Sequence, residues 1–162
     1  ALDELRQLIA DSRQQFGADS WPTLMVEGAM ATSLHRAAEF AAARDLRLQV
    51  IATMRERFGG HSELGVQLSH LAAHLVQLQQ AEAAEVAARE AIERMTRQFG
   101  ADHRMLGNAH SHLGAALLQQ QRRDAAGVAL LEARRIFAAA LPPTHPLIEQ
   151  NEARIAAWQA GR

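Results

Sequence analysis

The chain has 162 residues, of which 17 are Lys or Arg and 18 are Asp or Glu, and its formal net charge is -1. This balance excludes the one-sided positive surface that nucleic-acid binding requires, so we predict no direct contact with nucleic acid. The sequence has no cysteine, which excludes disulfides and thiolate metal sites. Because no apolar run reaches membrane-spanning length and no signal peptide opens the sequence, we expect a cytoplasmic protein without a membrane segment.

The composition favours helices throughout. Hydrophobic residues make up 48% of the chain and aromatic residues only 4%. Much of the apolar share is alanine, which has the highest helix propensity, and apolar residues recur at three- and four-residue steps. We therefore predict an all-α protein with helices at residues 2–15, 22–37, 39–57, 62–78, 81–98, 104–120, 123–140 and 146–160.

The first elements are a single leading helix within residues 1–19 and a helical pair within residues 20–60. The leading helix has no hairpin partner before it. The pair forms the first full unit and opens near Trp21. Its key packing positions carry small or aliphatic residues, namely Met30, Ala31, Leu34, Ala43 and Val50.

Two further units follow at residues 61–102 and 103–144, and a terminal helix occupies residues 145–162. A glycine or proline mark precedes each of them, and a similar mark ends the leading helix. The marks read Phe16-Gly17-Ala18-Asp19-Ser20, Phe58-Gly59-Gly60-His61, Phe99-Gly100-Ala101-Asp102-His103 and Leu141-Pro142-Pro143-Thr144-His145. The histidines of the last three marks are 42 residues apart, and Ser20 precedes the first of them by 41. The chain is therefore a repeat array.

The repeats also match inside the units. Leu68-Ser69-His70-Leu71-Ala72 aligns with His110-Ser111-His112-Leu113-Gly114. Small residues at equivalent positions let the two helix axes of a unit approach closely. These residues are Ala72 and Gly114 in the first helices, and Ala84, Ala91, Ala126 and Ala133 in the second helices.

The marks also suggest how the helices begin and end. The glycine in each of the first three marks is typical of a helix C-terminus, and we expect Asp102 or Thr144 to cap the helix that follows. His61, His103 and His145 recur with the repeat period, which indicates a shared structural role. We expect each of them to form a hydrogen bond such as one to a carbonyl of a neighbouring loop.

This pattern resembles the tetratricopeptide repeat (TPR) family, and the 42-residue period with its Phe-Gly-Ala-Asp-His mark is similar to the kinesin-light-chain-like branch. The resemblance implies one α-solenoid over residues 1–162, in which antiparallel helix hairpins stack into a right-handed superhelix. It also implies a non-enzymatic domain that binds a protein or peptide and needs no cofactor. Arrays of this branch are often attached to regulatory domains, so we expect the repeat region of a larger bacterial signalling or regulatory protein.

In such an array the first helices of successive units line a concave groove. Leu68, Leu71 and Leu75 point into the hairpin, so the opposite side of that helix faces the groove. The same geometry in each unit gives the candidate partner-binding residues Met25, Gly28, Thr32, His35, Arg36, Val66, Ser69, Ala73, Val76, Gln77, Asn108, Ser111, Ala115, Leu118 and Gln119.

Two features depart from the family. Ser69 and Ser111 stand where relatives usually carry asparagine. Arg36 alone offers a positive charge on this wall, so the carboxylate clamp of some TPR domains is absent. The open alternatives are a partner that binds the convex face, and a ligand-sensing domain that closes around a small molecule or signalling peptide.

The histidines raise a third hypothesis, a metal-dependent function. His70 and His74 are four residues apart on a helix, a spacing that can chelate one ion, and His112 is the repeat equivalent of His70. No Glu follows His70 in the His-Glu-x-x-His manner. We place the His70–His74 pair on the helix flank that packs toward the next repeat and interpret it as polar contacts between repeats, so we predict no metal site.

Two tryptophans lie near the ends of the array. A large apolar side chain at the end of an array can serve as a cap or as a docking surface for another domain or a second copy of the chain, and we expect Trp21 and Trp158 to contact a neighbouring domain. The sequence has no nucleophile elbow, phosphate-binding glycine loop or acidic metal cluster, so we predict no catalytic residue.

Overall fold

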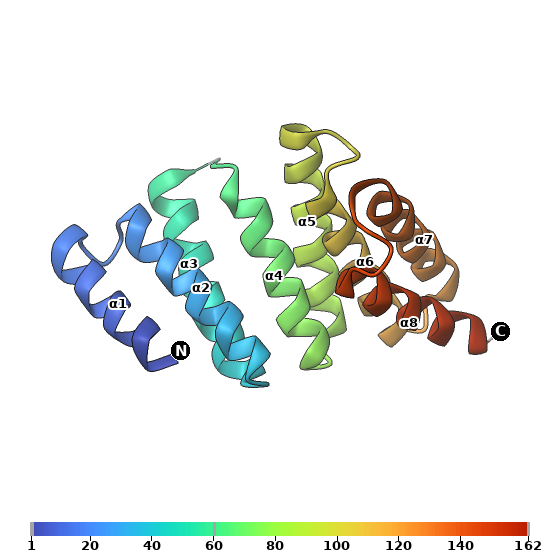
Figure 1. The fold of residues 1–162 in the computed structure, drawn as a ribbon, viewed down its shortest axis with the longest axis horizontal. Helices are drawn as coiled ribbons and strands as arrows, with labels where there is room; N and C mark the ends of the chain where they lie inside the picture. Colours follow the sequence, from blue (N-terminus) through green and yellow to red (C-terminus); the bar gives the residue numbers. More distant parts are fainter. Residues whose placement is uncertain (1, 60, 162) are drawn as a thin grey trace.

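The computed structural model describes residues 2–59 and 61–161, which form eight α-helices and no strand (Figure 1). The helices are α1 (Leu2–Phe16), α2 (Trp21–Arg36), α3 (Phe40–Phe58), α4 (Glu63–Gln77), α5 (Ala81–Phe99), α6 (Arg104–Gln119), α7 (Arg123–Ala140) and α8 (Pro146–Ala160). Every helix begins and ends within one residue of its predicted limit, and the all-α fold class is confirmed. None of these described helices has the length and apolar character needed to cross a membrane.

The helices form two layers (Figure 1). The inner layer consists of α2, α4, α6 and α8, each of which contacts the next inner helix. The outer layer consists of α1, α3, α5 and α7, and each outer helix packs against the inner helices that precede and follow it in the chain. Within the described residues, no two outer helices bring Cα atoms within 8 Å of each other. The array is therefore closed on its inner face and open between helices on its outer face.

The predicted small residues do allow the helices to approach closely. Ala72, Ala84 and Ala126 are fully buried. A Cβ atom at Gly114 would lie 2.5 Å from Leu130 Cγ, so no larger residue fits there without movement. These contacts join the helical pairs α4–α5 and α6–α7 through one continuous core.

A side chain at the start of each inner helix accepts a hydrogen bond from that helix's backbone. Ser20 Oγ accepts from the N–H group three residues on at 3.4 Å. The Nδ1 atoms of His61, His103 and His145 accept from the N–H group two residues on, at 3.2, 3.4 and 3.2 Å. Ser20, His103 and His145 are thus helix N-caps, and His61 forms the same kind of bond from the residue before the N-cap Ser62. Each satisfies a backbone donor that would otherwise lack a partner.

Two details of the predicted caps are wrong. The helix caps are histidines and not Asp102 or Thr144, because the extended backbone that precedes a helix falls on His103 and His145. Asp102 instead pairs with Arg135 at 2.8 Å. The histidines have the expected structural role, but their rings accept from a helix N–H group and do not bond to a loop carbonyl.

The turn inside each helical pair also repeats. Its central residue has a positive φ, which is 62° at Ala38, 57° at Gln79 and 61° at Gln121. The next N–H group donates to the carbonyl five residues earlier at 2.9 Å in all three turns. This is the hydrogen-bond pattern of a Schellman motif, in which glycine is the residue normally found at the positive φ.

The two ends of the array are packed, and this corrects the expectation for Trp158. Its ring lies over Gly127, where a Cβ atom would approach within 2.3 Å, and its Nε1 donates to Arg123 O at 3.0 Å. Trp158 is 7% exposed and so is part of the core between α7 and α8. Trp21 is half-buried and packs edge-to-face on Phe58, with ring centroids 5.3 Å apart.

Candidate functional site

The predicted groove residues divide into two groups by exposure. Ser69, Val76, Ser111 and Ala115 are buried, because the side of each inner helix on which they lie packs against the neighbouring inner helix. Gly28 is buried as well. The others are partly or fully exposed, namely Met25, Thr32, His35, Arg36, Val66, Ala73, Gln77, Asn108, Leu118 and Gln119. Their role in partner binding stays a prediction.

The inner layer carries a row of nitrogen-bearing side chains at one repeat position. Gly28, His70, His112 and Arg154 follow one another at intervals of 42 residues on α2, α4, α6 and α8. In the first unit the position is a glycine, and the guanidinium of Arg47 fills its place. We call Arg47, His70, His112 and Arg154 the inner row.

Arg47 reaches the inner layer from the outer helix α3. A Cβ atom at Gly28 would lie 3.2 Å from Arg47 Nη1, so the missing side chain makes room for the guanidinium. Arg47 is 1% exposed, its Nη2 donates to Thr32 Oγ1 at 2.8 Å, and its Nη1 donates to Gln67 Oε1. Burial lowers the pKa of Arg47 to about 10, while Glu63 acts in the opposite direction. The group therefore remains a cation at neutral pH.

Arg154 holds the other end of the row. Its Nη1 donates to Ser111 Oγ at 2.7 Å, and that hydroxyl donates to Asn151 Oδ1 at 2.7 Å. The amide of Asn151 in turn donates to Leu130 O at 3.0 Å. Burial lowers the pKa of Arg154 to about 10, which leaves it charged at neutral pH. Ser111 is thus buried and helps to position the guanidinium of Arg154.

Imidazoles occupy the middle of the row. Burial, reinforced by Arg47 and His35, lowers the pKa of His70 to about 4. Burial, with Arg154 and His70 acting in the same direction, lowers the pKa of His112 well below its usual range. Both rings are neutral at pH 7, so the row consists of two cations separated by two neutral rings.

His74 lies beside the row and contacts the preceding repeat. Its Nδ1 is 2.8 Å from Nδ1 of His35 on α2, and burial lowers its pKa to about 3. The expectation that His70 and His74 pack toward the next repeat is therefore wrong for His74, because α4 turns that side toward α2.

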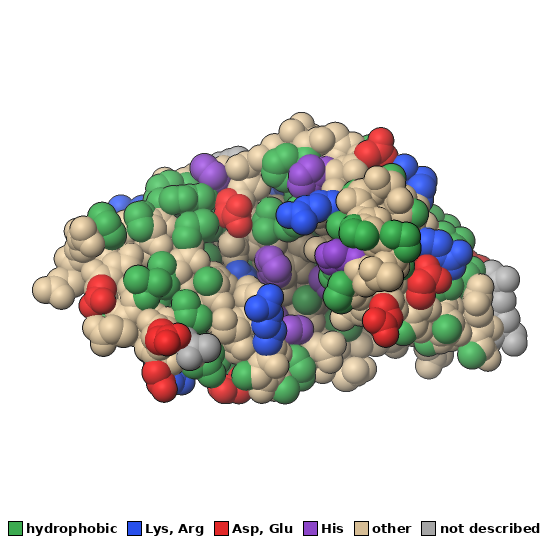
Figure 2. Space-filling view, in the orientation of Figure 1, with side chains coloured by type: hydrophobic (Ala, Val, Ile, Leu, Met, Phe, Trp, Pro, Cys, Tyr) green, Lys and Arg blue, Asp and Glu red, His purple; other side chains and the backbone are tan. Residues whose placement is uncertain are grey.

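Among residues 2–59 and 61–161, the centre of the inner row and its Arg154 end have no acidic partner. No carboxylate in the described part of the chain contributes to the pKa shifts of His70, His74, His112 or Arg154. Within the described residues, the buried atoms Arg47 Nε, His74 Nε2 and His112 Nδ1 have no hydrogen-bond partner. Figure 2 shows histidine and arginine side chains gathered around the middle of the inner face, over α4. The arrangement suits a ligand that supplies negative charge and hydrogen-bond acceptors.

No three or more His, Asp or Glu side chains among residues 2–59 and 61–161 are grouped so that they could hold a metal ion. The 2.8 Å contact between His35 and His74 instead requires that one ring donates a proton to the other.

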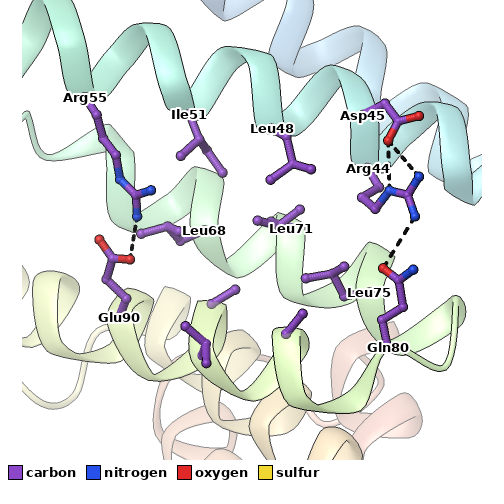
Figure 3. Close-up of a pocket in the computed structure, with 13 residues that line it drawn as sticks. Arg44, Asp45, Leu48, Ile51, Arg55, Leu68, Leu71, Leu75, Gln80 and Glu90 are labelled. Atoms are coloured by element: carbon purple, nitrogen blue, oxygen red, sulfur yellow. Dashed lines mark hydrogen bonds and ion pairs between the residues drawn. The ribbon is translucent and has the colours of Figure 1, made fainter.

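The outer face carries a different feature, an apolar slot between α3 and α5 with α4 as its floor (Figure 3). The slot has a volume of about 670 Å³. Its aliphatic lining comes from three helices and includes Leu48, Ile51, Leu68, Leu71, Leu75 and Val86. We call it the first outer slot.

A second outer slot of about 800 Å³ lies between α5 and α7 over α6. Its Leu113, Leu117 and Val128 stand 42 residues after their counterparts in the first outer slot. The α5 wall differs, because it contributes Arg89 where α3 contributes aliphatic residues to the first outer slot. An outer slot therefore recurs with the 42-residue repeat, but the residues of one of its walls differ between the two slots.

Sequence reasoning missed three parts of these sites. Arg154 was detectable, since it follows His112 by 42 residues. Arg47 was not, because a residue of an outer helix enters the inner layer only where Gly28 leaves room. The outer slots depend on the spacing between outer helices, which the sequence pattern does not give.

Antiparallel helix pairs stacked at a 42-residue period define this chain as an α-solenoid of the TPR-like class. It is similar to two crystal structures from Podosopora anserina of a protein described as a kinesin light chain with nearly identical TPR-like repeats. They show TM-scores of 0.77 and 0.76 at 17% identity, over 99% of this chain and 76% and 77% of theirs. The structure of BtubC (BKLC) from P. vanneervenii has a TM-score of 0.76 at 15% identity, over 98% of this chain and 70% of that one.

No protein-family model and no curated protein matches the sequence. The likeness to solved structures therefore establishes the fold, which confirms the predicted TPR-like, kinesin-light-chain-like architecture. Folds of this class are in general non-catalytic scaffolds for protein interactions.

Proposed function

We propose that this chain is a non-enzymatic scaffold whose inner face binds a carboxylate-bearing peptide segment of a partner protein. We further propose, from the family resemblance, that it acts as the repeat region of a larger bacterial signalling or regulatory protein. The observation that supports the inner face is the inner row, in which cations and imidazoles recur along four helices. Three of its four positions have no acidic partner among the residues that the structure describes.

Burial explains why an acidic segment would bind there. The desolvated Arg154 and the rings of His70 and His112 have lost hydration without gaining a carboxylate. A carboxylate of a ligand replaces that lost hydration and pairs with the guanidinium in a partly buried setting, where charge-assisted hydrogen bonds are strong. Arg36 and His35 lie on the exposed side of the same region and offer further donors.

The row also predicts a pH dependence of binding. A bound carboxylate favours the protonated form of a neighbouring imidazole, so it raises the pKa of His70 and His112 from their lowered values. Binding is then coupled to proton uptake, and affinity for an acidic segment increases as pH falls from 7 toward 6. A purely apolar ligand shows no such change.

The test uses a fluorescent 12-residue Gly/Ser peptide that contains four glutamates, and the same peptide with glutamines in their place. Fluorescence anisotropy should show binding of the glutamate peptide and at least about fivefold weaker binding of the glutamine peptide. The variant Arg154→Gln should weaken binding by a similar factor. The matched control Arg134→Gln, on the outer helix α7, should leave it unchanged.

Equal affinity for the two peptides, or equal effects of the two arginine variants, would contradict the proposal. Succinate and glutamate as competitors address the ligand-sensing alternative. If either small dicarboxylate binds as tightly as the glutamate peptide, the chain is better described as a small-molecule sensor.

A further inference from the structure

The first outer slot is an uncovered apolar surface on the face opposite the inner row. Val86 and Leu48 on its two walls are 68% and 45% exposed. Because α3 and α5 bring no described Cα atoms within 8 Å of each other, the backbone does not close the gap between them. Exposed aliphatic residues that line a concave surface are typical of a docking site.

The slot has a defined length, because polar contacts close both of its ends (Figure 3). Arg55 pairs with Glu90 at 2.6 Å at one end, and Arg44 donates to Gln80 at 3.4 Å at the other. Arg44 and Arg55 are eleven residues apart on α3, which corresponds to roughly 16 Å, or three helical turns. The occupant therefore presents an apolar face about three turns long.

The charges at the rim are already paired within the chain. Arg55 pairs with Glu90, and Arg44 pairs with Asp45 at 2.8 Å. The two cations and two anions of the rim thus offset one another. A ligand that matches the slot therefore presents an uncharged surface to it. A charged group placed between the two pairs would lose hydration without gaining a partner.

The backbone of the slot distinguishes a helix from an extended peptide. Apart from Gln80 and Ala83 at the start of α5, its walls and floor are interior turns of α3, α4 and α5, whose backbone N–H and C=O groups bond within their own helices. An extended segment would find no backbone partners there, whereas a helix brings its own hydrogen bonds. The floor residues Leu68, Leu71 and Leu75 are spaced to meet one stripe of such a helix.

We propose that the first outer slot binds an amphipathic helix of a partner protein, which presents aliphatic side chains at three- and four-residue steps and no charge toward the slot. The second outer slot is a poorer match, since Arg89 replaces the aliphatic α3 wall. This docking surface shares no residue with the inner row and opens on the opposite face of the array.

The experiment uses a fluorescein-labelled 14-residue helical peptide with four leucines at three- and four-residue steps and alanine or glutamine elsewhere. A second peptide has glutamate in place of the two central leucines. Fluorescence anisotropy should show binding of the leucine peptide to the wild-type chain. Val86→Glu should weaken it at least about tenfold, since it places a charge among the aliphatic residues of the slot.

The chain offers a matched control for this variant. Val128 is the repeat equivalent of Val86 and is 72% exposed in the second outer slot. Val128→Glu should leave the affinity of the leucine peptide unchanged, and so should the inner-row variant Arg154→Gln. Ala83→Leu, which fills the first outer slot without adding charge, should weaken binding. Circular dichroism confirms that each variant is folded.

Three results would overturn the proposal. The first is no binding of the leucine peptide, or equal binding of the peptide with central glutamates. The second is an equal loss of affinity in Val86→Glu and Val128→Glu. The third is a wild-type chain that sediments as a dimer while Val86→Glu sediments as a monomer, which would identify a second copy as the occupant.

Discussion

The Nδ1 atoms of His35 and His74 lie 2.8 Å apart, although the two residues belong to different repeats. One ring must donate to the other, so the contact exists only while at least one of the two Nδ1 atoms is unprotonated. The charged Arg47 contributes further positive potential to His74. The junction between α2 and α4 thus depends on neutral imidazoles at its centre.

This dependence predicts that the protein loses stability in mild acid. The pKa of His70 is lowered to about 4 and that of His74 to about 3, while an unfolded histidine has a pKa near 6.5. Between about pH 6.5 and 4 the unfolded chain therefore binds more protons than the native one. As the pH decreases through this range, the free energy of unfolding should decrease by up to about 1.4 kcal/mol per pH unit for each ring.

Urea unfolding at pH 7, 6 and 5 measures this slope. Replacing the ring in His74→Gln should reduce the slope by about one proton over the same window. A slope that is the same in the variant and the wild-type chain would show that His74 does not carry the effect.

A second prediction concerns the packing of α6 against α7. A Cβ atom at Gly107 would lie 2.4 Å from Phe137 Cε1, and Phe137 is 1% exposed. Gly107→Ala should therefore lower the free energy of unfolding by about 1–3 kcal/mol, as overpacking a core does. Gly28→Ala should cost less, because its nearest neighbours at 3.2 Å are side-chain ends. Thermal unfolding of both variants gives the comparison, and a smaller effect at Gly107 would contradict it.

The histidine caps can be tested by replacement with better and poorer caps. His103→Ala should lower the free energy of unfolding by about 1 kcal/mol, because Met105 N loses its acceptor at 3.4 Å. His103→Asp should preserve or raise stability, since aspartate caps helices well and favours their N-termini. If alanine and aspartate have equal effects in urea unfolding, the hydrogen bond contributes nothing measurable.

The positive φ angles in the helix turns predict stabilising substitutions. Gln79 and Gln121 have φ of 57° and 61°, a conformation that costs a non-glycine residue roughly 1 kcal/mol or more. Gln79→Gly and Gln121→Gly should each raise the melting temperature. The free energy of unfolding should rise by about 0.5–1 kcal/mol, a value that already includes the greater flexibility of glycine in the unfolded chain. Gln77→Gly, two residues earlier within α4, is the control and should lower it.

The helices could be predicted from the sequence to within one residue because breakers and apolar steps are both local signals. The small residues Ala72 and Gly114 likewise predicted close packing of the helices. These local signals do not indicate which residues of an inner helix are covered by the next inner helix. Ser69 and Ser111 therefore seemed to face a partner, whereas they lie buried between neighbouring helices.

The candidate sites were less accessible to sequence reasoning than the fold. Arg47 lies on an outer helix, and its entry into the inner layer depends on the space beside Gly28, a contact between residues 19 positions apart. The first outer slot depends on the separation of α3 and α5, which is set by packing on α4. Both features arise from distances between elements, and a pattern read along one helix does not contain them.

The 42-residue interval of the inner row has a consequence for how such an array can change. Duplication of one whole unit would add one nitrogen-bearing side chain to the row, and deletion of one would remove one, while the remaining positions kept their spacing. The length of a peptide bound on the inner face as proposed would thus be set by the number of units. Recombination between units could alter it in single steps without redesign of any helix.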